Sequence, residues 1–355
     1  MNNEKMPDLV AAMQERVLGR TQLKVKILGV GGISPQEVVE KALAYGLNFF
    51  DVHCYVDSQG KDNRTRFRKA LAKCPRNRSD LVLTDRSYAL SKEELLADLD
   101  KTLDMLGVEY LDIYGLYNIT QSADRVEKAS ASGGAIEGLR EAKAEGKIKF
   151  IGGVSGHHHR ELVRLIQKDE FDAVMVAINL FDQDVINSVL PVTQELNMGT
   201  IAMKPFAKGL FTCNPEAALN YVFSQNISVA IPGMMTLGEL EKNIRIAARF
   251  SGISESDLSA LKREADEISK REGRHICRQC GYCVPVCPQE IDIKDLFYQE
   301  RQANRYYSKD WAQAAYAKVT HKADECIECG ACEGECPYDL PIREMLKQVH
   351  VDLST

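Results

Sequence analysis

CRQCGYCVPVCP, at residues 277–288, and CIECGACEGECP, at residues 326–337, decide the fold at the C-terminal end of this chain. Each stretch spaces four cysteines as C-x2-C-x2-C-x3-C and places a proline after the fourth. Eight of the eleven cysteines in the 355 residues lie in these two stretches. Tight two-residue loops let three thiolates converge on one centre, and the proline redirects the chain after the fourth. The matched spacing predicts two metal centres rather than a set of disulfides.

This spacing is the bacterial pattern for a pair of [4Fe–4S] clusters, in which the fourth cysteine of each run binds the other cluster. It predicts a ferredoxin-like module with two clusters. The alternative is a pair of structural zinc sites, but zinc binds CxxC pairs and does not require two matched runs of four with a trailing proline. The predicted ligands are Cys277, Cys280, Cys283 and Cys336 for one cluster, and Cys326, Cys329, Cys332 and Cys287 for the other.

Upstream of this module, short apolar runs alternate with longer segments of helical spacing. Runs such as LDIYGLY at 111–117 predict buried parallel strands, and segments such as SKEELLADLDKTLDMLG at 91–107 predict crossover helices. We count eight such units over about 225 residues, the usual size of a closed barrel. An open doubly wound sheet is the alternative, but no GxGxxG fingerprint follows the first run.

The predicted fold class is therefore α/β, a (β/α)8 TIM barrel followed by a helical connector and a ferredoxin-like domain with two [4Fe–4S] clusters. The expected boundaries are an N-terminal extension at residues 1–22, the barrel at 23–250, the connector at 251–274 and the cluster domain at 275–355.

Composition narrows the classes of partner. The net charge is -6 and the sequence pI is about 5.8, which argues against nucleic acid because a phosphate backbone attracts clustered Lys and Arg. No apolar run approaches the roughly 20 residues that span a bilayer, so no membrane contact is expected. The N-terminal residues lack the apolar core of a signal peptide. Dense cysteine without such a signal predicts a reducing, cytoplasmic location.

Nearly the whole chain resembles the iron–sulfur branch of the aldo-keto reductase superfamily. The resemblance implies a (β/α)8 barrel, NADP(H) and carbonyl reduction at the C-terminal mouth of the barrel. Besides the cysteine runs, it is carried by LGRTQLKVKILGVGG (18–32), GLNFFDV (46–52), YLDIYGL (110–116), IGGVSGHH (151–158), IAMKPFAKGLF (201–211) and IPGMMTLGELEKN (231–243).

In that family an Asp, a Tyr, a Lys and a His reduce the carbonyl group, and the Tyr acts as the general acid. The resemblance implies that Asp51 matches the Asp, and that Tyr55 matches the Tyr if one residue is deleted in DVHCY. It places Asp85 at the Lys position and Tyr117 at the His position. Arg86 follows Asp85, but neighbouring residues on a strand point to opposite faces. Because a carboxylate raises the pKa of a nearby phenol, we expect no ordinary hydride mechanism here.

Other groups are expected at the same mouth. If Asp51 and Asp85 are adjacent, one should be protonated, and pairing of one of them with Arg86 is the alternative. Cys54 is a candidate redox-active thiol, although a small core residue is the more common role. The predicted catalytic set is Asp51, His53, Cys54, Tyr55, Asp85 and Tyr117.

The resemblance also implies an NADP(H) site. Ser155 and Asn179 stand where the family binds the nicotinamide carboxamide. Met203 and Lys204 stand where many relatives have an aromatic ring under the nicotinamide. The predicted cofactor-binding set is Ser155, Asn179, Lys204, Gly233, Glu241 and Asn243.

Taken together, the sequence predicts an oxidoreductase that passes electrons between the clusters and a small substrate or cofactor at the barrel mouth. A redox partner, such as a ferredoxin or a flavoprotein, would supply or accept the electrons. Two alternatives stay open. One is a lyase or isomerase that uses acid–base chemistry on the same barrel, and the other is an electron-carrier subunit with a vestigial barrel.

Overall fold

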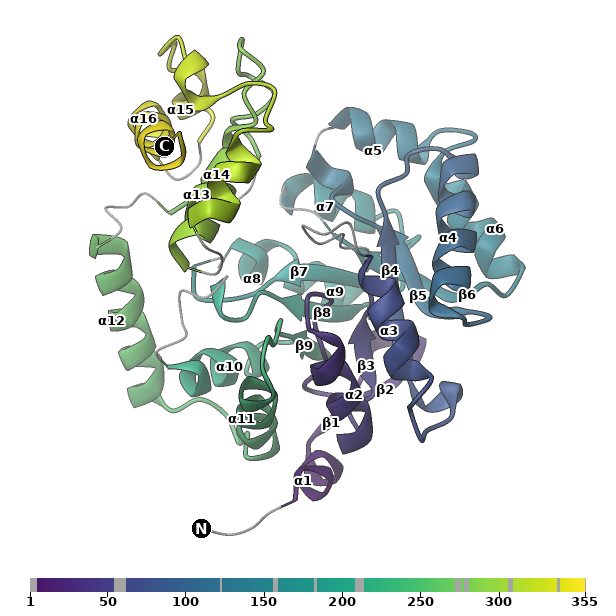
Figure 1. The fold of residues 1–355 in the computed structure, drawn as a ribbon. Helices are drawn as coiled ribbons and strands as arrows, with labels where there is room; N and C mark the ends of the chain where they lie inside the picture. Colours follow the sequence, from purple (N-terminus) through teal and green to yellow (C-terminus); the bar gives the residue numbers. More distant parts are fainter. Residues whose placement is uncertain are drawn as a thin grey trace. The chain divides into compact units, whose positions relative to one another are not determined.

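The computed structural model describes residues 5–53, 62–121, 123–155, 159–181, 184–207, 214–271, 276–277, 281–305, 309–336 and 339–354. The chain forms two compact units, residues 1–262 and 263–355 (Figure 1). The division falls within helix α12 (Glu255–Arg271), inside the range expected to be a helical connector. None of the helices in the described ranges is long and apolar enough to cross a membrane.

Seven parallel strands make one sheet in the first unit, and their order in the sheet follows the chain. A short segment closes the sheet, because Leu28 bridges to Ala230 of the last strand and Val30 bridges to Phe50 of the first. The predicted (β/α)8 barrel is therefore confirmed. The strands are β3 (Phe49–Asp51), β4 (Val82–Ser87), β5 (Leu111–Leu116), β6 (Ile148–Val154), β7 (Ala173–Ala177), β8 (Gly199–Met203) and β9 (Val229–Ile231).

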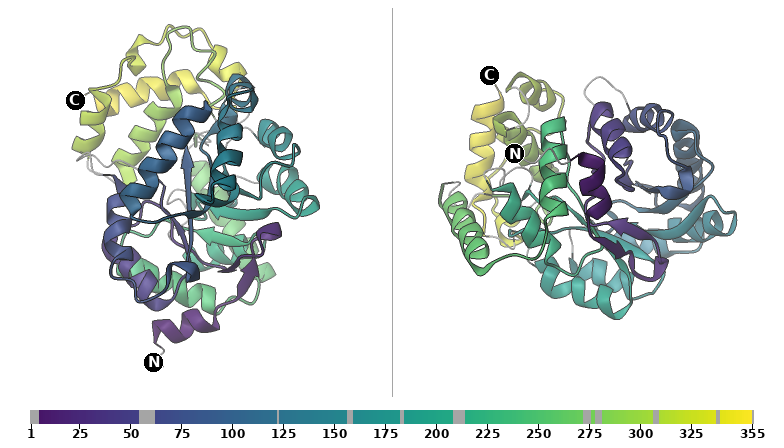
Figure 2. Two further views of the ribbon diagram at one scale, coloured as in Figure 1. Left: turned by 90° about the vertical axis from the view of Figure 1, so that its right-hand side faces the viewer. Right: turned by 90° about the horizontal axis from the view of Figure 1, so that it is seen from below.

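Helices connect successive strands and lie outside the sheet (Figures 1 and 2). The sequence specifies their ends locally. In α4 (Lys92–Leu106), the Ser91 hydroxyl accepts a hydrogen bond from the backbone N–H of Glu94, and Gly107 ends the helix at φ 70°. The other helices around the barrel are α2 (Gln36–Tyr45), α3 (Asn63–Leu71), α5 (Ala123–Ser130), α6 (Ala135–Ala144), α7 (His159–Ile166), α8 (Asp184–Ser188), α9 (Leu190–Glu195), α10 (Pro215–Phe223) and α11 (Leu237–Ala248).

The N-terminal segment precedes the barrel strands. It contains α1 (Met6–Ala12), which contacts α2 and α11. An antiparallel hairpin of β1 (Glu15–Val17) and β2 (Lys24–Lys26) follows.

The register of the strands decides which side chains enter the barrel. One buried apolar cluster holds Phe49 of β3, Val82 of β4, Ile113 of β5 and Met175 of β7, together with residues of β8 and β9. This cluster fills the inside of the barrel. Since side chains alternate along a strand, the inward position of Val82 puts Arg86 inside and Asp85 outside.

The second unit packs short helices around its own core. They are α13 (Ile293–Arg305), α14 (Lys309–Tyr316), α15 (Ala331–Gly334) and α16 (Ile342–Leu353). α13 contacts both α14 and α16. The buried core includes aliphatic side chains of α13 and α16 and three of the cluster cysteines, Cys277, Cys283 and Cys332.

Candidate active site and cysteine pocket

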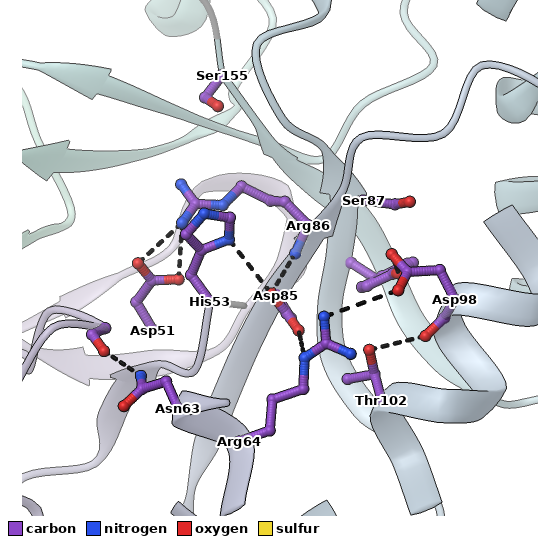
Figure 3. Close-up of polar contacts among 12 residues, drawn as sticks. Asp51, His53, Asn63, Arg64, Asp85, Arg86, Ser87, Asp98, Thr102 and Ser155 are labelled. Carbon is purple, nitrogen blue, oxygen red and sulfur yellow. Dashed lines mark hydrogen bonds and ion pairs between the residues drawn. The ribbon is translucent and has the colours of Figure 1, made fainter. Parts of the chain in front are cut away.

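An ion pair between Asp51 and Arg86 lies inside the barrel, near the C-terminal ends of β3 and β4 (Figure 3). The Nη2 atom of Arg86 donates to both carboxylate oxygens of Asp51, at 3.0 and 2.9 Å. Its Nη1 atom points at the sulfur of Met175. Asp51 is 5% exposed and Arg86 is 2% exposed. This end of a barrel is where enzymes of this architecture hold their reactive groups.

Burial raises the pKa of the Asp51 carboxyl, and the nearby charge of Asp85 adds to this rise. The positive charges of Arg86 and His53 act in the opposite direction. A guanidinium stays protonated in proteins, so it cannot serve as a general acid. The pair therefore offers a fixed positive charge and a carboxylate, and a proton must come from another group.

The structure corrects one expectation about β4. The resemblance implies Asp85 at the position of the family lysine, with Arg86 on the opposite face of the strand. The alternation is as expected, but the inward residue is Arg86, which pairs with Asp51. The error was one of register, and Val82 carries the signal that corrects it, because an apolar side chain four residues earlier faces the same interior.

Asp85 lies on the outer face of β4, fully buried beneath α3 and α4 (Figure 3). Its carboxylate is 3.4 Å from Nε of Arg64 and 3.6 Å from Nδ1 of His53. Nη2 of Arg64 lies 3.7 Å from Asp98, which also accepts a hydrogen bond from the Tyr114 hydroxyl at 3.3 Å. Burial opposes ionisation of Asp85, yet the nearby His53 ring and the charge of Arg64 hold its pKa below the ordinary value.

The two carboxylates therefore have separate cation partners. Of the two alternatives left open for them, the contacts correspond to pairing of Arg86 with one carboxylate. Sequence reasoning did not identify Arg64 at all. Its signal is its spacing in NRTRFRKAL, because Arg64 is three residues before the buried Phe67 and shares its helix face.

Aromatic side chains lie beside the ion pair of Asp51 and Arg86. The ring of His53 stacks on Tyr117, with centroids 4.6 Å apart and planes 20° apart. Tyr88 packs against the same tyrosine at 4.6 Å, and the guanidinium of Arg86 lies 5.3 Å from the centre of the Tyr117 ring. Tyr117 and His53 thus lie in the predicted catalytic region. Cys54 and Tyr55 lie outside the described residues.

Three predicted nicotinamide-binding residues lie at or after the ends of β6, β7 and β8. Ser155 is buried, and its hydroxyl accepts a hydrogen bond from the backbone N–H of Asn118 at 3.4 Å. The Asn179 amide donates to the carbonyl of Lys204 at 3.2 Å. Lys204 has a left-handed backbone, with φ 57°. Their role toward a nucleotide stays a prediction.

The three residues predicted for the nucleotide end follow β9. Gly233 lies in the loop before α11, and Asn243 is buried within that helix. The carboxylate of Glu241 accepts hydrogen bonds from the Tyr45 hydroxyl at 3.2 Å and from Arg245 at 3.4 Å. Both contacts come from protein groups, so a nucleotide that needed this carboxylate would compete with them.

In the second unit, one pocket is lined by Cys287, Cys326, Cys329 and Cys332. These are the four cysteines predicted for the second cluster. Burial raises the pKa of the Cys332 thiol to about 11, and Glu333 and Cys326 add to the rise. Such a thiol is protonated at neutral pH, so a bound metal centre is what would hold it as a thiolate. The donor set therefore fits an iron–sulfur cluster.

The other predicted cluster is described only in part. Cys277 and Cys283 are buried and Cys336 is half-buried, whereas Cys280 lies outside the described residues. Gly281 has φ 87° and Gly330 has φ 76°, so both cysteine loops contain a left-handed turn. Within the described ranges, no group of three or more His, Cys, Asp or Glu residues is arranged to hold a single metal ion.

Comparison with known proteins agrees with both halves of this description. A family model described as aldo/keto reductase family matches residues 33–216, just over half of the chain. A second, described as 4Fe-4S dicluster domain, matches residues 276–341.

Individual relatives are distant. An uncharacterized oxidoreductase, YqkF, of Bacillus subtilis is 24% identical over 234 residues, which cover 60% of this chain and 72% of the relative. L-glyceraldehyde 3-phosphate reductase of Escherichia coli K12 is 25% identical over 232 residues, which cover 58% of this chain and 65% of the relative. The solved structure of aldo-keto reductase AKR11C1 from Bacillus halodurans superposes with a TM-score of 0.60 at 19% identity, over 71% of this chain and 96% of that one. This last likeness is one of fold.

Proposed function

The chain belongs to the aldo/keto reductase family and is an oxidoreductase with a 4Fe-4S module, and on that premise we propose that it passes electrons between two [4Fe–4S] clusters and a small substrate or cofactor at the barrel mouth. The proposal depends chiefly on one observation. Cys287, Cys326, Cys329 and Cys332 line one pocket in the second unit, as the ligands of one cluster would.

The residues at the mouth suit a substrate that gains negative charge on oxygen, such as a carbonyl compound. Arg86 would stabilise that charge, and Asp51 would hold the guanidinium in place. The proton would come from His53, which Asp85 orients from the outer side of β4. Conversion of a carbonyl to an alcohol replaces the C=O π bond with new C–H and O–H bonds, and it consumes two electrons, which the clusters would supply, and two protons, one from His53 and one from water.

The cysteine module accounts for the source of the electrons. The clusters, when bound, supply electrons singly, and a ferredoxin or a flavoprotein is the class of partner that would reload them. Cys287, Cys326, Cys329 and Cys332 would hold one cluster at the pocket described above. Because this many thiolates survive in a reducing environment, we place the protein in the cytoplasm.

A second candidate is the family's own reaction, hydride transfer from NADPH. The contact between Arg86 and Asp51 favours it, because it puts a positive charge beside Asp51. With Asp85 in that position, the charge there would have been negative. Lys and Arg differ here in an important way. A guanidinium that donates through one nitrogen to both oxygens of a carboxylate is less available to lower a tyrosine pKa than a mobile ammonium. We therefore rank this candidate second.

The two candidates differ in the electron donor that they need. The test uses full-length, cluster-loaded protein under anaerobic conditions, with a panel of aldehydes and quinones. We expect oxidation of a reduced viologen dye that depends on substrate, and negligible oxidation of NADPH. A Cys329→Ser variant should lose iron and the dye-linked activity together.

The opposite pattern would contradict the proposal. NADPH turnover near 1 s⁻¹, on the scale of typical enzymes, that persists in Cys329→Ser would show hydride transfer without the clusters. A preparation that takes up zinc and no iron would contradict the cluster assignment itself.

A further inference from the structure

One charged side chain lines the cysteine pocket among its described residues. Arg343, in the first turn of α16, lies with Cys287, Cys326, Cys329 and Cys332 around the same space. The others lining it are apolar or uncharged polar residues. The guanidinium also lies against the tight cysteine loop, since a Cβ atom added at Gly330 would be 3.9 Å from its Cζ atom. A permanent cation, whose side chain is 42% exposed, is thus part of the wall of the pocket.

Glu333 fixes the position of this cation. Its carboxylate accepts hydrogen bonds from Nε of Arg343 at 2.9 Å and from the backbone N–H of Arg343 at 2.9 Å. Nη2 of Arg343 lies 2.7 Å from the same carboxylate. Glu333 directly follows Cys332 in the chain, so the acid that holds the arginine comes from the cysteine run itself. The pair joins α16 to the loop that carries three of the four cysteines.

We propose that Arg343 raises the midpoint potential of the cluster held by Cys287, Cys326, Cys329 and Cys332, and that Glu333 limits this rise. The inference rests on the cluster assignment in the proposed function. Reduction adds one negative charge to the centre, so a nearby fixed cation favours the reduced form and a nearby anion opposes it. Net charge and solvent exposure are among the factors that set such potentials.

The same helix contains a matched control. Lys347 is four residues after Arg343 and is paired with Glu328 at 2.9 Å, but its side chain is 63% exposed, against 42% for Arg343, and it is not among the residues that line the pocket. Solvent and salt screen such a charge. Lys347→Gln therefore removes one positive charge from the same helix without removing a charge from the pocket wall.

The experiment is an anaerobic redox titration of the full-length, iron-loaded protein, followed by electron paramagnetic resonance. Arg343→Gln should shift one of the two cluster transitions to lower potential by at least a tenfold change in the oxidised-to-reduced ratio, which is 59 mV for one electron. Glu333→Gln should shift the same transition upward. Arg343→Lys should stay closer to the wild type than Arg343→Gln.

Two internal references accompany these shifts. The second cluster transition should not move in any of these variants, and Lys347→Gln should move neither. Unchanged potentials in both Arg343→Gln and Glu333→Gln, with full iron content, would overturn the role of Arg343 and leave the cluster assignment standing. Equal shifts in Arg343→Gln and Lys347→Gln would also overturn it, because they would reflect net charge rather than the pocket wall. Absence of iron in the wild type would overturn the cluster assignment as well.

Discussion

Asp85 and Arg86 are neighbours on β4, both buried and both ion-paired, yet they belong to different regions of the barrel. Arg86 faces the interior and pairs with Asp51 at the mouth. Asp85 faces outward and pairs with Arg64 beneath α3 and α4. Two neighbouring residues of β4 therefore belong to ion pairs with different surroundings. The pair of Arg86 and Asp51 faces the proposed reaction, and the pair of Asp85 and Arg64 joins the sheet to its helices.

His53 lies close enough to influence the carboxyl groups of both pairs. Its Nδ1 atom lies 3.6 Å from the outer carboxylate of Asp85, and its ring stacks on Tyr117 at the mouth. The outer pair can therefore influence the mouth through the position of this ring and through the charge of Asp85, which raises the pKa of Asp51. The inner pair is therefore the candidate for chemistry, and the outer pair is the candidate for anchoring the sheet to its helices.

The largest expected effect is on stability, when the outer pair is broken. Asp85→Ala should lower the free energy of unfolding by about 3 kcal/mol, because it removes the nearest carboxylate of the buried Arg64, which keeps only its longer contacts with Asp62 and Asp98. Urea denaturation of the cluster-loaded protein measures this loss. Asp100→Ala is the matched control, since Asp100 pairs with Lys147 at 2.8 Å but is 55% exposed, and such a pair contributes about 0–1 kcal/mol. Equal losses in the two variants would remove the distinction between an anchoring pair and a surface pair.

The inner pair should act mainly on turnover. Arg86→Gln removes the cation that would stabilise negative charge on the substrate, so we expect a fall in kcat of about 10²–10³-fold. The dye-linked assay measures it, and Arg78→Gln is the control because Arg78 pairs with Asp112 at 2.8 Å away from the proposed reacting groups. If Arg86→Gln kept wild-type turnover, the inner pair would not be catalytic.

The pH dependence of stability should differ in sign between the two acids. Asp85 has a lowered pKa, so its contribution is present above the ordinary Asp value of about 3.9 and is lost as pH falls through its folded-state pKa. Asp51 has a raised pKa, so its ionisation weakens the folded state as pH rises past that ordinary value. Each titration changes the free energy by at most about 1.4 kcal/mol per pH unit.

Subtracting the stability curves of Asp85→Asn and Asp51→Asn from that of the wild type isolates the two contributions. The advantage of the wild type over Asp85→Asn should shrink on acidification below about pH 4. The stability of the wild type relative to Asp51→Asn should fall as the pH rises above about 4. Two curves of the same sign would mean that the acids share one environment.

The smallest expected effect concerns Tyr114, whose hydroxyl contacts Asp98 next to the outer pair. Tyr114→Phe removes the hydrogen bond from the tyrosine hydroxyl to Asp98, 3.3 Å long, and should cost about 1 kcal/mol of stability. It should leave dye-linked turnover within twofold of the wild type. A large fall in turnover with unchanged stability would show that the outer network takes part in the reaction.

Much of the fold could be predicted from the amino-acid sequence alone. The spacing of the cysteines predicted a ferredoxin-like module because covalent geometry limits which thiols can converge on one centre. The alternation of apolar runs with helical segments predicted the barrel, because buried parallel strands and amphipathic helices leave different periods in a sequence. Asp51, Tyr117 and Ser155 were placed at strand ends by the same patterns.

The tertiary structure decided what those patterns left open. Whether Asp85 or Arg86 enters the barrel depends on strand register, and a shift of one residue exchanges the two faces. The contact of Asp85 with Arg64 joins positions 21 residues apart, and that of Arg86 with Asp51 joins positions 35 apart. No local pattern records these partners, because long-range pairing follows from how the strands and helices pack. The sequence by itself determined which elements form and which thiols can share a centre, while packing in three dimensions determined which charges neutralise one another.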